Sequence, residues 1–142
     1  MTNRTALDRV LHFFENVSPQ SVKEITELYD ADAYFKDPFN EVRGQANIIH
    51  IFEHMFRQVD APRFIIKQSI LQDGDAFIVW DFEFNMRGTK QLQTIHGSSH
   101  VRFNTAGKVE YHRDYWDAAE ELYEKIPVLG NLMRFIKRKA RG

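Results

Sequence analysis

The stretch AFIVWDFEFNMRGTKQLQTIHGSSHVRF, residues 76–103, decides the fold class of this 142-residue chain. Its first part has an apolar side chain at every even position: Ile78, Trp80, Phe82, Phe84 and Met86. A period of two with polar residues between predicts a strand with one buried face. In the second part the odd positions from Ile95 to Phe103 are small or apolar, so His96 and His100 are expected to point outward.

Four long segments rich in β-branched and aromatic residues fill the second half of the chain: Arg63–Gln72, Ala76–Met86, Lys90–Phe103 and Lys108–Trp116. Glycine-containing turn sequences separate them, as in β-hairpins. We therefore expect an antiparallel meander. The last segment is ambiguous, because its even positions include His112 and Asp114 while its odd positions are more apolar. By apolar content alone Asp114 would lie outside, and alternation does not decide.

The first half of the chain has helical periodicity. Ala6 to Val17 predict one helix, with Thr5 and Asp8 as a capping box, and Val22 to Tyr29 predict a second, with Ser21 and Glu24 as its box. A short strand at Ala33–Asp37 and a third helix between Gly44 and Asp60-Ala61-Pro62 follow. The order α-α-β-α-β-β-β-β-α predicts an α+β fold, with the N-terminal helices on the concave face of a curved antiparallel sheet.

Composition narrows the function classes. Hydrophobic residues make up 43% and aromatic residues 13% of the chain, enough to line a cavity as well as fill a core. A net charge of −1 argues against a dedicated nucleic-acid binder. The chain has no cysteine, which excludes disulfides and thiolate metal sites. With no signal peptide or membrane span in the sequence, we expect a cytoplasmic protein.

No cofactor or metal site is expected. His50 and His54 are four residues apart on one helix face, but only Glu53 accompanies them.

The sequence divides into a domain, residues 1–126, and a basic amphipathic helix, residues 127–142. Five cationic side chains follow Val128: Arg134, Lys137, Arg138, Lys139 and Arg141. This helix is expected to pack on the domain or on a second subunit. The alternative is contact with an anionic membrane surface.

Two runs carry a family resemblance: LYDADAYFKDPFNEVRG, residues 28–44, and SSHVRFNTAGKVEYHRDYWD, residues 98–117. They resemble the SnoaL-like (nuclear transport factor 2-like) superfamily, which includes ketosteroid isomerases, polyketide cyclases, limonene epoxide hydrolases and scytalone dehydratases. The resemblance covers about residues 5–117. It implies a cone-shaped fold with a pocket for a small apolar molecule, and a homodimer through the outer sheet face near His96, His100 and Arg102. It implies no single activity, because the fold hosts many.

The resemblance also implies site residues. Asp37 in KDPF matches the general base of the ketosteroid isomerases, and Asp114 in HRDYWD matches the last-strand aspartate of the epoxide hydrolases, which favours an inward Asp114. Where the isomerase has a tyrosine and a protonated aspartate as its oxyanion hole, this chain has Phe13 and Ser99. Where the hydrolase has an arginine and an aspartate, it has Gly97 and Ser99. Neither named activity therefore carries over residue by residue.

Each candidate has a structural alternative. Asp37 is either a turn aspartate or a base whose pKa is raised by burial. Asp114 either pairs with Arg113 or Arg102 on the sheet surface or forms an acid/base pair with Asp37. His112 is a proton shuttle, an orienting partner for Asp114, or a half-buried polar residue.

The leading hypothesis is a cofactor-free enzyme acting on a small, mostly apolar, oxygen-bearing molecule. Asp37 would be the general base, and Asp114 an acid or the holder of a water molecule, with Ser99 and His112 as supporting donors. Alternatives are a non-catalytic binding protein and a scaffold whose cone only stabilises a dimer. The candidate ligand-binding residues are Phe13, Phe35, Phe52, Trp80, Phe82, Phe84, Ser99, Val101 and Trp116.

Overall fold

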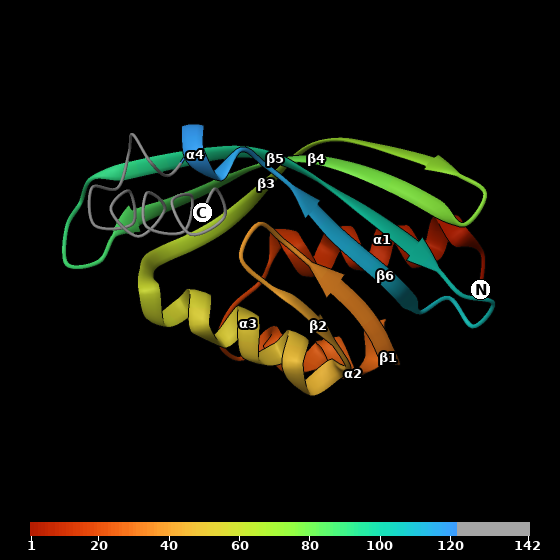
Figure 1. Cartoon of the computed structure of the whole chain (residues 1–142). Coiled ribbons are helices and arrows are strands. Elements are labelled where there is room, and N and C mark those ends of the chain that lie inside the picture. The colour runs from red at the N-terminus through yellow and green to blue at the C-terminus, as the bar shows by residue number, and fades with distance from the viewer. Residues whose placement is uncertain (122–142) are drawn as a thin grey trace, which may run out of the picture.

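The computed structural model describes residues 1–121 (Figure 1). The basic helix expected at residues 127–142, with its membrane alternative, lies outside the described residues. The elements are α1 Asn3–Glu15, the 3-10 turn η1 Ser21–Glu24, α2 Ile25–Leu28, β1 Tyr29–Lys36, β2 Glu41–Arg43, α3 Gln45–Gln58, β3 Val59–Gln72, β4 Asp75–Met86, β5 Leu92–Phe103, β6 Val109–Tyr115 and α4 Ala118–Glu121. Within residues 1–121, no helix is long and apolar enough to cross a membrane.

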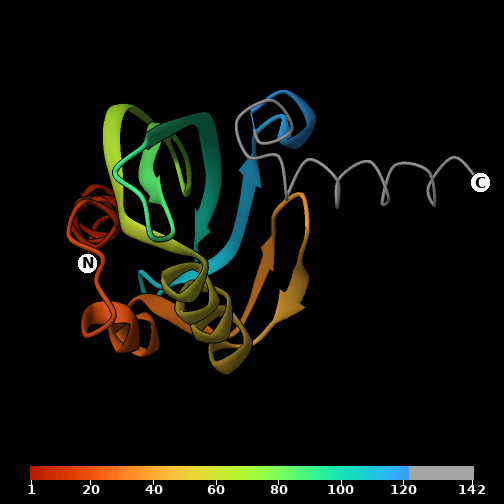
Figure 2. The ribbon, with the colours of Figure 1, turned by 90° about the vertical axis from the view of Figure 1, so that its left-hand side faces the viewer.

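The strands form one six-stranded sheet in the order β2-β1-β6-β5-β4-β3. Figures 1 and 2 show a curved sheet with α1, α2 and α3 on its concave side, which confirms the α+β prediction. The sheet is mixed rather than antiparallel throughout, because β1 pairs parallel to β6. Strand β2 was not predicted, since its three residues Glu41–Arg43 are too few to show alternation.

Both predicted capping boxes are wrong. Helix α1 begins earlier, because the Thr2 hydroxyl caps it by accepting the Thr5 N–H at 3.1 Å. Before η1, Ser18 and Ser21 exchange N–H···Oγ bonds of 2.9 and 3.0 Å, and this pair takes the place of a Ser21–Glu24 box. The second helix is also shorter than predicted, because Tyr29 already belongs to β1.

The sequence Asp60-Ala61-Pro62 was expected to end the third helix, but it lies inside β3. The pairing of β3 with β4 is irregular between Asp60 and Arg63, and Ala61 has a φ of 50°. Since β3 is an edge strand and the ladder is interrupted there, a proline is tolerated.

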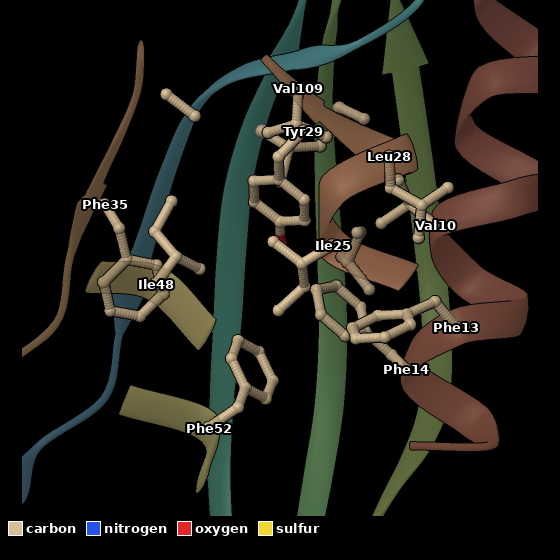
Figure 3. Packing of buried hydrophobic residues seen from close by; sticks show 14 of the residues in the cluster. Val10, Phe13, Phe14, Ile25, Leu28, Tyr29, Phe35, Ile48, Phe52 and Val109 are labelled. Carbon is tan, nitrogen blue, oxygen red and sulfur yellow. The ribbon is translucent and has the colours of Figure 1, made fainter. Parts of the chain in front are cut away.

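The core lies between the helices and the concave face of the sheet. Trp80 and Phe84 of β4 and Ser99 and Val101 of β5 are buried there, which confirms the alternation predicted for these strands. Figure 3 shows aromatic side chains of α1 and α3 in this layer, and the rings of Phe13 and Phe52 are 5.9 Å apart.

Candidate active site

A β-bulge in β6 determines which residues of that strand face the concave side of the sheet. Val109 pairs with Phe103 and Tyr111 pairs with Arg102, so one extra residue lies on the β6 side. Such a bulge reverses the alternation. As a result Val109 and His112 are both buried, at 0% and 1% exposure. Simple alternation cannot describe this strand, which is why the sequence left Asp114 undecided.

A chain of hydrogen bonds crosses the concave face at this point. The Tyr29 hydroxyl lies 2.7 Å from Nδ1 of His112, and Nε2 of His112 lies 2.7 Å from Oδ1 of Asp114. Ser99 donates its hydroxyl proton to the same Oδ1 at 2.6 Å. Trp80 donates its indole N–H to the Ser99 oxygen at 2.9 Å. The inward alternative for Asp114 is therefore the one the structure adopts.

Aromatic rings enclose the histidine end of this chain. The ring of Phe35 lies 4.8 Å from the His112 ring and that of Phe14 lies 5.6 Å from it, both edge to face. The His112 side chain is 2% exposed, whereas that of Asp114 is 18% exposed. Burial, and next the charge of Asp114, raise the pKa of Tyr29 well above its ordinary value, so this phenol stays protonated. The chain of hydrogen bonds thus runs from the buried Tyr29 and His112 to the partly exposed carboxylate of Asp114.

The second carboxylate, Asp37, caps its own turn. Its Oδ1 accepts the backbone N–H groups of Phe39 and Asn40 at 2.8 and 2.7 Å, and the Asn40 side-chain amide lies 3.1 Å from both oxygens. Burial nevertheless raises the pKa of Asp37, aided by the charge of Asp114 and opposed by these hydrogen bonds. Asp37 therefore caps a turn and also has a raised pKa, to which the charge of Asp114 contributes.

The other predicted site residues lie beside the hydrogen-bond chain or in the core around it. Phe35 packs on His112, and Val101 pairs with His112 across β5 and β6. Phe13 and Phe52 pack together between α1 and α3. Phe82 lies 5.4 Å from Phe84. Trp116 packs on Phe39 at 5.6 Å, next to the Asp37 turn.

Sequence reasoning missed Tyr29 and Phe14 as site residues. Both were assigned to apolar helical stripes, and a stripe does not show that a phenol will reach a histidine 83 positions away. The only local signal was a tyrosine next to the DAD run that opens the quoted motif.

Gly97 sets the position of Trp80. A Cβ at Gly97 would lie 2.8 Å from Cζ2 and Cζ3 of the Trp80 indole. The absence of a side chain therefore lets the indole lie against the β5 backbone and reach Ser99.

The opposite face of the sheet carries a different set of side chains. A groove of about 420 Å³ is lined there by Asp30, Asp32, Tyr34, Arg43, Arg102, Glu110 and Tyr111. The rings of Tyr34 and Tyr111 stack 5.3 Å apart. Within residues 1–121, no group of three or more His, Cys, Asp or Glu side chains is arranged to hold a metal ion.

The α+β fold with its curved six-stranded sheet is the fold of a known protein class. The chain belongs to the SnoaL-like domain family, whose model matches residues 10–112. No curated protein matches the chain.

Solved structures agree on the fold. The chain is similar to an NTF2-like protein of unknown function from Burkholderia pseudomallei, with a TM-score of 0.72 and 15% identity over 84% of this chain and 95% of that one. It is similar to a protein of ketosteroid isomerase-like fold from Catenulispora acidiphila in complex with trimethylamine, with a TM-score of 0.66 and 12% identity over 78% and 83% of the two chains. It is also similar to TerC co-crystallised with polyporic acid, with a TM-score of 0.68 and 18% identity over 82% and 92%.

Proposed function

We propose that this protein binds a small, mostly apolar, oxygen-bearing molecule at the concave face of its sheet and performs cofactor-free acid/base chemistry on it. The observation that carries the proposal is the hydrogen bond of 2.7 Å between buried His112 and partly exposed Asp114, whose charge also acts on Asp37. A structural ion pair needs no second carboxylate nearby. A proton-transfer site benefits from one, because environments that separate two pKa values create an acid and a base.

Two features support a ligand of this kind. Aromatic rings surround His112, and the oxygens of Asp114 and Ser99 lie at the other end of its hydrogen-bond chain, which suits an apolar molecule with one or two oxygen atoms. Two proteins of this fold were solved with small organic molecules, polyporic acid and trimethylamine.

The chemistry would be a proton shift. One carboxylate takes a proton from the ligand or from a water molecule, and the second carboxyl group, protonated beforehand, gives its proton to another atom of the ligand. Isomerisation, cyclisation, dehydration and epoxide opening all fit this scheme.

A non-catalytic binding protein is the second candidate, and the Asp37 turn favours it. Four hydrogen bonds already engage the Asp37 carboxylate, so the turn alone accounts for this residue. A binder would use the same aromatic walls without turnover.

Native mass spectrometry of freshly purified protein would identify a co-purified molecule, and Trp fluorescence titration would then test steroid-, polyketide- and terpene-like compounds. For a compound that binds, Asp114→Asn and Asp37→Asn should retain binding and lose turnover by about 100-fold or more. Turnover by both variants at the wild-type rate would refute the catalytic proposal. Binding without turnover by the wild-type protein would establish the binder.

We also propose a homodimer through the outer sheet face. Phe77, Val79 and Tyr115 are 46%, 40% and 44% exposed there, and His100 stacks on Phe77. Size-exclusion chromatography with light scattering should give a dimer that Phe77→Asp weakens. A monomer at high concentration would contradict this.

A further inference from the structure

The Tyr29 hydroxyl determines where the proton of His112 lies. Tyr29 is 1% exposed, and among residues 1–121 its hydroxyl has a hydrogen bond only to Nδ1 of His112. If Nδ1 carried a proton and donated it, the buried phenol proton would have no acceptor, which is unfavourable. The phenol therefore donates, and Nδ1 accepts.

The tautomer of His112 follows from this. With Nδ1 as an acceptor the ring is neutral and its proton lies on Nε2. That proton points at Oδ1 of Asp114, which is 2.7 Å away. Tyr29 and Asp114 are the titratable groups that contact His112. Phe14 of α1, Phe35 of β1 and Val101 of β5 supply apolar contacts or pairing, and Asp37 acts on the site through its interaction with Asp114.

The other end of the chain has an equally fixed direction. The Trp80 indole can only donate, so the Ser99 oxygen accepts from it and the Ser99 proton must go elsewhere. It points at Oδ1 of Asp114, 2.6 Å away. Oδ1 thus receives two protons, one from each side, and a carboxylate oxygen has two lone-pair sites.

We infer that Oδ2 is the atom of Asp114 that exchanges a proton with a ligand, and that Tyr29 is a positioning residue that keeps the proton of His112 on Nε2. This inference rests on the proposed function only for the proton exchange with a ligand. With Oδ1 accepting hydrogen bonds from both sides, any proton that Asp114 takes or gives must move at Oδ2.

Nitrogen-15 NMR of the histidine rings tests the tautomer without any ligand. In the full-length protein the neutral His112 ring should be protonated on Nε2, with His112→Gln used for assignment. The exposed His50 and His54 provide reference signals in the same spectra. A doubly protonated His112 ring near neutral pH, or a proton on Nδ1, would overturn the inference.

Tyr29→Phe tests the positioning role. Without the phenol proton, Nδ1 loses its hydrogen-bond donor, so the nitrogen-15 signal of Nδ1 should shift. Tyr34→Phe is the matched control, because Tyr34 lies on the same strand and its hydroxyl bonds to Glu41 on the outer face. An unchanged His112 signal in folded Tyr29→Phe would remove Tyr29 from the mechanism, whatever its effect on stability.

Asp114→Asn tests the assignment of the oxygen. Since the atom in the place of Oδ1 must accept two hydrogen bonds, the carbonyl oxygen of the introduced side-chain amide should lie there and the amide nitrogen should take the place of Oδ2, leaving the His112 tautomer unchanged. A shift of the His112 proton to Nδ1 would show a reversed amide and overturn the Oδ2 assignment. Intact tautomers in both proteins, together with wild-type turnover by Asp114→Asn, would instead refute the proposed function.

Discussion

The two faces of one sheet use the same residue pair in different ways. Inside, His112 and Asp114 have side chains that are 2% and 18% exposed, and their neighbours Tyr29 and Ser99 are neutral hydrogen-bond donors. Outside, His96 pairs with Asp81 at 2.6 Å while its side chain is 65% exposed.

Cations accompany the outer pairs. Lys67 lies 3.5 Å from Asp81, and Arg102 lies 3.0 Å from Asp75, which also bonds to His100. Hydrogen bonds from His96 and His100 are the main cause of the lowered pKa values of Asp81 and Asp75. The groups around a His–Asp pair, rather than the pair itself, therefore determine what kind of interaction it makes. Water and cations make a screened ion pair, whereas buried neutral donors make a directed hydrogen-bond chain.

Trp80→Ala should give the largest difference between the faces. Trp80 is 3% exposed, packs on Phe64 at 5.3 Å and supplies the donor to Ser99, so its truncation should cost about 3–5 kcal/mol of unfolding free energy. Leu92→Ala is the control, because Leu92 is an apolar side chain that is 56% exposed at the start of β5, and it should cost about 1 kcal/mol or less. Urea unfolding measures both. Equal losses would mean that the inner network is no better packed than the surface.

Gly97→Ala should cost about 1–3 kcal/mol, because the added methyl group meets the Trp80 ring. The indole must move, so the near-UV circular dichroism of Trp80 should change as well. Ser98→Ala, one position along β5, is the control and should change neither signal. A loss below about 0.5 kcal/mol for Gly97→Ala would show that the indole has room to shift.

The alternation of apolar residues in the sequence predicted part of this arrangement. Alternation predicted the inward faces of β4 and β5 correctly, because both strands are long and regular over residues such as Trp80 and Ser99. It failed in β6, where one extra residue between Val109 and Tyr111 reverses the period. Asp37 and Asp114 were candidates through resemblance, not through any pattern of their own.

The hydrogen-bond chain itself could not be predicted. The Tyr29–His112 bond joins residues 83 positions apart, and it depends on a parallel pairing of β1 with β6 that local periodicity does not show. The directions of the bonds depend on burial, which comes from the whole fold.

The pH dependence of stability should have opposite signs on the two faces. The pKa of Asp37 is raised in the folded protein, so its ionisation disfavours folding. Its favourable contribution is complete below the unfolded pKa of about 3.9 and is lost as pH rises through the folded value. The stability of Asp37→Asn relative to wild type should therefore increase from about pH 4 to 7.

Asp81→Asn should do the reverse. The pKa of Asp81 is lowered, so its contribution is present above the unfolded pKa and is lost as pH falls through the folded value. Relative to wild type, this variant should lose stability as pH rises. Chemical unfolding checks both slopes, over about pH 4 to 7 for Asp37→Asn and below about pH 5 for Asp81→Asn. Parallel curves for the two variants would contradict the difference in environment.

His96→Gln should have the smallest effect. The pair with Asp81 is exposed on the histidine side, so its loss should cost about 0.2–1 kcal/mol, measured near pH 5.5 where histidine charges. In about 1 M salt the screening length falls to about 3 Å, and the cost should become unmeasurable. His112→Gln should lose more stability, and this loss should persist in salt, because neutral donors and packing hold His112 in place. Salt-insensitive losses for both variants would mean that the outer pair is also shielded from solvent, as it would be if a second subunit covered that face.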